Sequence, residues 1–339
     1  MKDNKNSTLE LLKLLASYMV VFIHVLFPGK FGVAVDAIAR FAVPFFFLIS
    51  GFYSTQITTS KIRQRIWSAA KLFLIAAVCF TLFRLANFVV SGDVAGIRLY
   101  FAQYRDPMVL AKLFFLNCTL SSVHLWYLLA IIYVYFFLYL ATKLRVKENI
   151  IIIVAICILA VHLLMEECLP FFGVSFPAEL TRNFVFMGIP FFSLGLLAKK
   201  QEDKLRSVPN YIVVLAAALG ILESVLSRFL GERNELYLGS LLITFALTVV
   251  FIKYSHVKFS RAFDFFSGCS TYIYIFHLAV SFVLSKAISI LRIPATLSLA
   301  FRYASPILVC IITTVLAHGI VRISKRLVSK KKPQQLSET

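Results

Sequence analysis

The sequence predicts an all-α, polytopic integral membrane protein with about ten transmembrane helices. Hydrophobic residues make up 60% of the chain and charged residues 15%, whereas a soluble domain carries about 25% charged residues. The 34 phenylalanines would favour aggregation in water but are ordinary in lipid. The hydrophobic residues also gather in runs of about 20, the length that a helix needs to cross a bilayer.

Ten such runs are candidate spans, and mostly short polar connections separate them. They are residues 9–27, 37–54, 68–91, 123–142, 149–166, 183–198, 210–228, 238–254, 267–288 and 301–321. The sixth run is the shortest. An even number of spans predicts that both termini lie on the same side of the membrane.

The long connection 92–122 is predicted to lie along the membrane surface and not to cross it. Arg98, Arg105 and Lys112 recur every seven residues, which places them on one face of a helix with apolar residues elsewhere. Pro107 is expected to interrupt that helix, because proline lacks the backbone donor that a helix interior requires.

The net charge of +19 would suggest a nucleic-acid partner if the protein were soluble. Here the basic residues form short clusters between apolar runs, and most of them fall in alternate connections and at the two ends. Such an asymmetry identifies the cytoplasmic side of a membrane protein. We therefore expect cytoplasmic N- and C-termini and no nucleic-acid partner.

The sequence gives no pattern typical of a metal site or a soluble enzyme. Six cysteines are scattered singly without a C-x-x-C pair, so neither a zinc site nor a disulfide framework is expected. P-loop, G-x-S-x-G, H-E-x-x-H and G-x-G-x-x-G patterns are absent from the sequence. The candidates for chemistry are instead polar side chains inside apolar runs, which are costly in lipid and often functional.

The first predicted span carries two such residues. Lys13 and His24 are eleven residues apart, which leaves them about 20° from a common face and roughly 16 Å apart along a helix. Ser17 shares this face. Lys13 could simply be an anchor at the interface that pairs with Glu10. Anchoring does not explain an imidazole at the depth of His24, so His24 is the stronger functional candidate.

The second span adds Arg40 at its start and Ser50-Gly51 deeper in the bilayer. The Ser-Gly pair could serve only to let two helices approach closely. The connection that follows holds a dense cationic patch, Lys61, Arg63 and Arg65. That patch could be a topology signal or a binding site for an anionic ligand.

Two later spans supply further imidazoles. His124 opens the fourth span beside Trp126 and Tyr127, which by themselves are typical of an aromatic belt at a membrane surface. His277 lies in the ninth span, with Ser270 and Tyr274 on or near the same helical face.

These residues, in this order, resemble bacterial membrane-bound acyltransferase family 3, whose members move acyl groups onto cell-surface sugars. Similar to recurring segments of that family are Glu10 to His24, Phe46 to Gly51, the basic patch 61–65, His124 to Leu128, Asn183 to Gly195, and Ser270 to His277. The family has Arg where this chain has Lys13. Lysine keeps the charge but lacks the two-pronged donor geometry of arginine.

The resemblance implies an O-acyltransferase that takes an acetyl group from cytoplasmic acetyl-CoA and transfers it to a hydroxyl of a surface or lipid-linked polysaccharide. Acetyl-CoA is then a co-substrate, the protein lies in the bacterial inner membrane, and no metal is needed. Residues 1–322 would form the acyltransferase domain and 323–339 a basic cytoplasmic tail.

Roles for the candidate residues follow from this implied reaction. The expected catalytic residues are His24, His124, His277 and Tyr274; the expected acetyl-CoA ligands are Lys13, Ser17, Lys61, Arg63 and Arg65; the expected acceptor ligands are Arg40, Ser50 and Asn183. Asp36 is a weak candidate for the carboxylate that would orient His24. The alternative function is transport of a small polar solute or glycan intermediate through the same buried polar residues, and a membrane scaffold is a third possibility.

Overall fold

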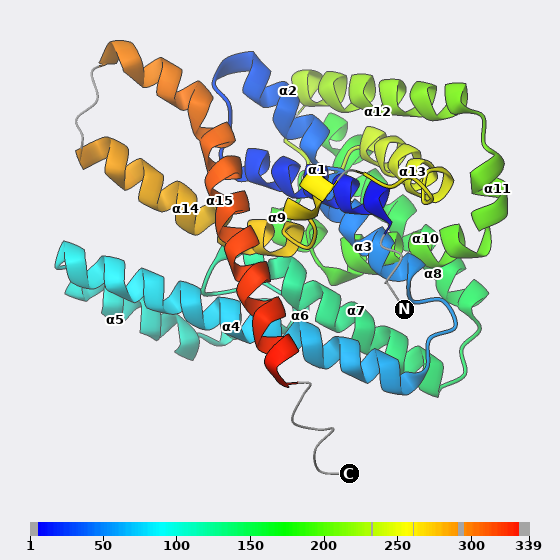
Figure 1. Cartoon of the computed structure of the whole chain (residues 1–339), viewed down its shortest axis with the longest axis horizontal. Helices are drawn as coiled ribbons and strands as arrows, with labels where there is room; N and C mark the ends of the chain where they lie inside the picture. The colour runs from blue at the N-terminus through cyan, green and yellow to red at the C-terminus, as the bar shows by residue number, and fades with distance from the viewer. Residues whose placement is uncertain (1–5, 232, 260, 291–294, 332–339) are drawn as a thin grey trace.

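The computed structural model describes residues 6–231, 233–259, 261–290 and 295–331. Every regular element in these ranges is helical (Figure 1). Eight helical segments there are long and apolar enough to cross a membrane. The protein is therefore an all-α, multi-pass membrane protein, as the composition predicts.

The eight long segments agree closely with eight of the predicted spans. They are α1 (Ser7–His24), α2 with α3 (Gly29–Ala39 and Ala42–Phe52), α4 (Thr59–Ser91), η2 with α7 (Val123–Leu125 and Trp126–Lys143), α8 with η3 (Glu148–Leu163 and Leu164–Cys168), α12 (Asn210–Leu230), α14 (Ser270–Ile290) and α15 (Ala295–Lys331).

The sixth and eighth predicted spans are helical but shorter. The sixth is η5 (Phe184–Gly188), a turn of π-helix, followed by α10 (Ile189–Lys200), and the eighth is α13 (Leu238–Lys253). Most residues of α10 and about half of those of α13 are buried. These two helices are thus covered largely by protein, while a helix such as α4 exposes most of its surface.

Two predicted boundaries are wrong for identifiable reasons. The second predicted span is two helices, which meet at Arg40 and Phe41. Pro44 lies in the first turn of α3 and has no N–H with which to continue the α2 ladder. The predicted basic loop, Lys61 to Arg65, is instead the beginning of α4, whose 33 residues measure about 50 Å and so exceed the hydrocarbon thickness.

The long connection folds back against the bundle as two short helices. These are α5 (Val94–Ala102) and α6 (Pro107–Leu116), with the single turn η1 (Gln103–Arg105) between them. Pro107 is the first residue of α6 and Asp106 caps it, so the predicted interruption occurs where proline is best tolerated. Tyr100 of α5 is buried, and its hydroxyl lies 2.9 Å from that of Thr81 on α4.

Helices α3 and α10 pack backbone against backbone near the centre of the molecule. A Cβ atom on Gly51 would lie 1.8 Å from the carbonyl oxygen of Phe192, and one on Gly195 would lie 2.0 Å from that of Leu48. Only glycine fits at such distances, so the predicted role of Gly51 in close helix packing is confirmed. Because α3 is fixed in this way, it can form a common wall for the two cavities described below.

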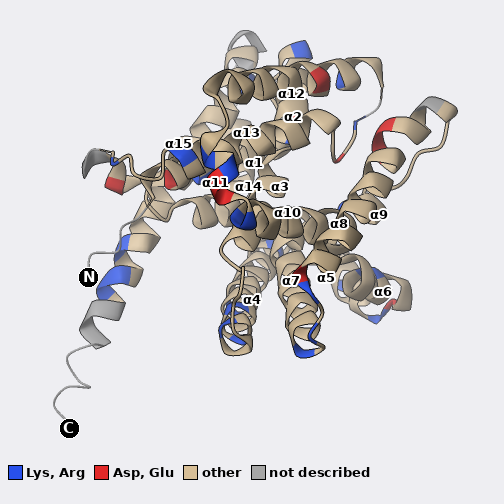
Figure 2. Cartoon of the chain, turned by 90° about the vertical axis from the view of Figure 1, so that its right-hand side faces the viewer, with Lys and Arg blue, Asp and Glu red and all other residues tan. Residues whose placement is uncertain are grey.

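Figure 2 looks onto the side of the bundle where α4 begins and α7 ends, and Lys and Arg residues gather at those helix ends.

The remaining short elements are η4 (Leu169–Phe172), α9 (Ala178–Thr181), α11 (Glu202–Ser207) and η6 (Arg261–Phe265). The predicted boundary at residue 322 falls inside α15, which continues to Lys331. Residues 332–339 of the predicted tail lie outside the described residues.

Candidate functional site: two cavities on either side of a tyrosine pair

Three imidazoles from three separate helices meet inside the bundle. His24 is the last residue of α1, His124 lies in η2, and His277 lies in α14. The ring centroid of His24 lies 5.1 Å from that of His277 and 6.4 Å from that of His124, and the other two rings are 5.0 Å apart. The structure thus brings together the three histidines that the sequence singled out.

His124 is held by hydrogen bonds at both ring nitrogens. Its Nε2 lies 2.8 Å from the carbonyl oxygen of Ile275, so it must donate there, and its Nδ1 lies 2.8 Å from the hydroxyl of Ser122. The hydroxyl of Tyr274 donates to the backbone carbonyl of His124. The ring of His124 is therefore fixed in place and has no ring nitrogen left for a further partner.

The other two imidazoles are less fully bonded. His277 is completely buried, and its Nδ1 lies 2.7 Å from the carbonyl oxygen of Tyr274. Its Nε2 has no hydrogen-bond partner among the described residues. His24 lines a pocket together with His124 and Tyr274, and no hydrogen bond links its ring to the described part of the chain.

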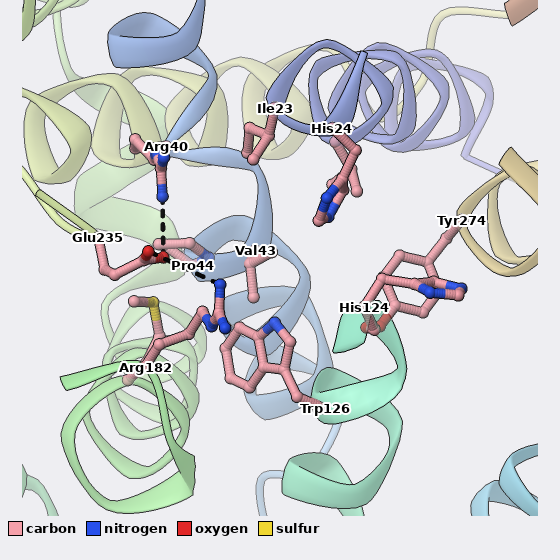
Figure 3. Close-up of a pocket in the computed structure, with 12 residues that line it drawn as sticks. Ile23, His24, Arg40, Val43, Pro44, His124, Trp126, Arg182, Glu235 and Tyr274 are labelled. Carbon is pink, nitrogen blue, oxygen red and sulfur yellow. Dashed lines mark hydrogen bonds and ion pairs between the residues drawn. The ribbon is translucent and has the colours of Figure 1, made fainter. Parts of the chain in front are cut away.

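The opposite side of this pocket is a network of charged side chains (Figure 3). Arg40 donates to Glu235 at 2.8 Å and to Asp36 at 3.1 Å, and its side chain is 4% exposed. Arg182 lies 3.6 Å from Glu235. Arg233 donates twice to Asp36, both at 2.8 Å, and this hydrogen bonding raises the pKa of Arg233 above its ordinary value.

Several polar contacts hold Arg182 and Glu235 in place. The amide of Asn183 caps η5 through the N–H groups of Val185 and Phe186, and its other end donates to the backbone of α9. Asn183 is thus committed to positioning the segment next to Arg182. The backbone N–H of Glu235 donates to the carboxylate of Glu166 at 2.9 Å.

We call this space the imidazole pocket; it is lined by Val20, Ile23, His24, Arg40, Val43, Pro44, His124, Trp126, Arg182, Met187, Glu235 and Tyr274. The free volume between these side chains is about 30 Å³, which is room for one water molecule. Its walls are therefore already close together in this conformation.

A much larger space of about 440 Å³ lies between α3, α4, α7 and α14. We call it the Arg65 cavity; it is lined by Ser50, Gln64, Arg65, Ser68, Ala69, Leu72, Tyr127, Leu128, Ile131, Tyr135 and Thr271. Arg65 donates to the hydroxyl of Ser54 at 2.6 Å and to the carbonyl of Tyr53 at 2.7 Å. Its guanidinium is held at the cavity wall and also lies 5.9 Å from the ring of Tyr135.

Two tyrosines separate the cavities. Tyr127 lines the Arg65 cavity and Tyr274 lines the imidazole pocket, and their ring centroids are 5.5 Å apart. Tyr127 also packs against Phe47, with ring centroids 4.7 Å apart. One wall residue of each cavity is therefore in contact with a wall residue of the other.

Other predicted ligands lie outside both cavities. Lys13 pairs with Glu10, Nζ to Oε1, at 2.5 Å. The hydroxyl of Ser17 bonds to backbone carbonyls of its own helix, and Lys61 and Arg63 are exposed on α4. Asp36 is bonded to arginines and not to His24.

Among the polar and aromatic residues of the imidazole pocket, sequence reasoning missed Arg182, Glu235 and the role of Trp126 as a pocket wall. Arg182 lies over the buried ring of Trp126, 5.8 Å from its centroid. The signal that could have identified Arg182 and Glu235 is that both are charged residues in short connections next to apolar spans. Among the residues that the structure describes, no group of three or more His, Cys, Asp or Glu is arranged to hold a metal ion.

The fold and the two cavities define a multi-pass membrane protein with a polar site buried between its helices. The chain belongs to acyltransferase family 3, because the model of that family, described as an acyltransferase domain, matches residues 6–318. It is therefore a membrane-embedded acyltransferase. No match to the chain was found among curated proteins or among solved structures.

Proposed function

We propose that the protein transfers an acetyl group from cytoplasmic acetyl-CoA to a hydroxyl of a cell-surface or lipid-linked polysaccharide in the bacterial inner membrane. In this proposal both termini are cytoplasmic, and the Arg65 cavity opens toward the cytoplasm. The observation that carries the proposal is the pair of cavities that meet at Tyr127 and Tyr274. One cavity has the size and charge for a long anionic donor, and the other has the imidazoles for proton transfer.

The Arg65 cavity supports the donor side of the proposal. Coenzyme A carries phosphates at one end and a thioester at the other, so its site needs a cation near the mouth and a mostly apolar channel beyond it. Arg65 supplies a guanidinium whose donors suit phosphate oxygens. Exposed Lys61 lies about one turn before it on α4, and exposed Arg63 about half a turn before it. The cavity extends from Arg65 to Ser50 and Tyr127, in the direction of the imidazole pocket.

The imidazole pocket supports the acceptor side. His24 has ring nitrogens available to take a proton from a hydroxyl, and an imidazole is suited to acid–base work near neutral pH. Arg40 and Arg182 offer donors to the oxygens of a sugar, and the ring of Trp126 forms an apolar wall. Because the free volume is only about 30 Å³, we expect the pocket to open when an acceptor binds.

The proposed chemistry is direct acyl transfer. His24 takes the proton from the acceptor hydroxyl while the oxygen attacks the thioester carbonyl carbon. The carbon–sulfur bond then breaks, its electron pair stays on sulfur, and the coenzyme A thiolate receives the proton from His24. The N–H of His124 and the hydroxyl of Tyr274 already donate to backbone carbonyls. Arg40 lines the same pocket and its Nε has no hydrogen-bond partner in the described residues, so it is the candidate to stabilise the negative oxygen of the intermediate.

The test is incorporation of radiolabelled acetyl from acetyl-CoA into surface glycan in membranes that contain either the wild type or His24→Ala. We expect incorporation by the wild type and a loss of at least a hundredfold in the variant, since a positioned acid–base group contributes about 10²–10⁴-fold. Equal incorporation by both would refute the role of His24. No incorporation by either, with movement of a labelled solute intact, would favour a transporter.

A further inference from the structure

Among the residues that the structure describes, no carboxylate is bonded to the proposed base, His24. Asp36 is bonded to Arg40 and Arg233, and Glu235 is bonded to Arg40 and close to Arg182. A histidine that acts as a base normally needs a partner at its second nitrogen, because that partner decides which nitrogen is free to react. The partner must therefore come from a different class of side chain.

His277 has the geometry of such a partner. The carbonyl of Tyr274, 2.7 Å from Nδ1, can only accept, so Nδ1 carries the hydrogen. In the neutral ring Nε2 then carries no hydrogen, and its lone pair can accept a hydrogen bond. A protonated ring would bury an N–H⁺ for which the described residues provide no acceptor, at a considerable cost.

Only His24 can satisfy that lone pair within the imidazole cluster. Both ring nitrogens of His124 are already bonded, to Ser122 and to Ile275. No direct hydrogen bond joins the His24 and His277 rings in this structure. The rings are tilted by 36° with centroids 5.1 Å apart, so a bridging water or a small rotation of the His24 ring would connect them. The ring of His24 makes no hydrogen bond to the described part of the chain, so it is free to take this partner.

We infer that His277 is the positioning residue of His24, an imidazole in the place where hydrolases use a carboxylate. This inference rests on the proposed function. One nitrogen of His24 donates its hydrogen to Nε2 of His277, directly or through a water molecule, and the other nitrogen keeps its lone pair for the acceptor hydroxyl. When His24 takes the acceptor proton, the bond to His277 strengthens and stabilises the imidazolium; His24 later returns the proton to the coenzyme A thiolate, and His277 gains no net proton.

The first test compares His277→Leu with His277→Gln in the labelled-acetyl assay. Leucine removes the acceptor, so we expect kcat to fall at least tenfold while KM for acetyl-CoA changes less than twofold. Glutamine can place its amide oxygen near the position of Nε2, so we expect it to retain at least five times the kcat of the leucine variant. Similar kcat values for leucine and glutamine, or a leucine variant within twofold of the wild type, would overturn the inference.

His162 provides a matched control. It is also completely buried, its Nδ1 lies 2.9 Å from the carbonyl oxygen of Phe186, and its Nε2 has no hydrogen-bond partner in the described chain. It differs in lying 4.0 Å from Glu166 and away from the imidazole pocket. His162→Leu should keep kcat within threefold of the wild type, and a fall as large as that of His277→Leu would contradict a specific role for His277.

A second measurement does not depend on activity. In protein with ¹⁵N-labelled histidine, the wild type should give one fixed tautomer for His24, identified by loss of its signal in His24→Gln. In His277→Leu that signal should move to the averaged shift of a ring that exchanges between tautomers. An averaged signal already in the wild type would overturn the pairing, even if the variants fail to fold. If the wild type shows the fixed tautomer but transfers no acetyl group, only the proposed function is refuted.

Discussion

The imidazole pocket and the Arg65 cavity lie on either side of two tyrosines but are built differently. The pocket has about 30 Å³ of free volume, and its lining includes two histidines, two arginines and Glu235, which is paired with both Arg40 and Arg182. The cavity has about 440 Å³, and its described lining includes one charged residue, Arg65. The charged groups of the pocket thus already pair with one another, while the cavity leaves room for a ligand.

This difference matches what each side would have to do in acyl transfer. Catalysis depends on groups that are oriented before the reaction, since their reorganisation would otherwise add to the barrier. A long, flexible donor instead needs space and a cation near one end. The following substitutions test two expectations. Substitutions in the pocket should lower the stability of the protein, and substitutions in the cavity should weaken the binding of the donor.

The largest effect on structure is expected from Arg40→Met. Arg40 is 4% exposed and bridges Asp36 and Glu235, so its removal leaves two carboxylates without their buried partner. Breaking a buried ion pair in this way costs about 3–5 kcal/mol, and we expect a clear fall in melting temperature in detergent together with loss of acetyl transfer.

Arg233→Gln is the control for Arg40→Met. Arg233 binds the same Asp36, but its side chain is 44% exposed, so water can replace part of its interaction. The melting temperature of Arg233→Gln should fall by less than half as much as that of Arg40→Met. Equal and small decreases for the two variants would mean that the pocket does not depend on its buried network.

Gly51→Ala tests the wall that the pocket and the cavity share. A Cβ atom would lie 1.8 Å from the carbonyl oxygen of Phe192, so α3 and α10 must separate. Overpacking of this kind costs about 1–3 kcal/mol, and because α3 carries Ser50 for the cavity and Pro44 for the pocket, both kcat and KM should worsen.

Gly319→Ala is the matched control on α15, where a Cβ atom would have no neighbour within 4 Å. Alanine is the better helix former by about 1 kcal/mol, so this variant should melt at the same temperature as the wild type or slightly higher. A Gly51→Ala variant that melts like Gly319→Ala would show that the two helices tolerate separation.

The sequence is sufficient to predict the helices and to single out the three imidazoles as candidates, whereas their convergence is seen only in the structure. An apolar run is a local signal, and each of the ten predicted spans contains a helix in the structure. Histidines inside such runs are conspicuous because a polar side chain is costly in lipid. Helix ends were harder to predict. The start of α4 at Thr59 was missed because Lys61 to Arg65 has the composition of a loop, although a helix can continue past the bilayer surface.

The charged half of the imidazole pocket could not be predicted in the same way. Arg40 meets Glu235 from 195 positions away along the chain, and a single sequence carries no periodic signal for such a pair. Asn183 illustrates the opposite difficulty. It lies in a segment that resembles the family, yet its amide caps η5, so a motif residue can support a site without lining it.

Arg65→Gln should weaken donor binding without changing the pocket. Loss of one charge-assisted contact to a phosphate should raise KM for acetyl-CoA about tenfold, which corresponds to about 1.4 kcal/mol, with kcat within twofold of the wild type. Initial rates over a range of acetyl-CoA concentrations measure both constants. Arg63→Gln, an exposed neighbour on the same helix, should raise KM less than threefold, and a fall in kcat alone for Arg65→Gln would contradict a role in binding.

The smallest effect is expected at Lys13, where the family has arginine. Lys13 is 27% exposed and its ammonium group is paired with Glu10, and it lines neither the pocket nor the cavity. An ion pair of this exposure is worth about 0–1 kcal/mol, so Lys13→Ala should change KM for acetyl-CoA less than threefold. Lys13→Arg has donors to spare beyond Glu10 and should lower KM if coenzyme A phosphates come near this helix. A tenfold rise in KM for Lys13→Ala would place the donor against α1 and would mean that the Arg65 cavity holds only part of it.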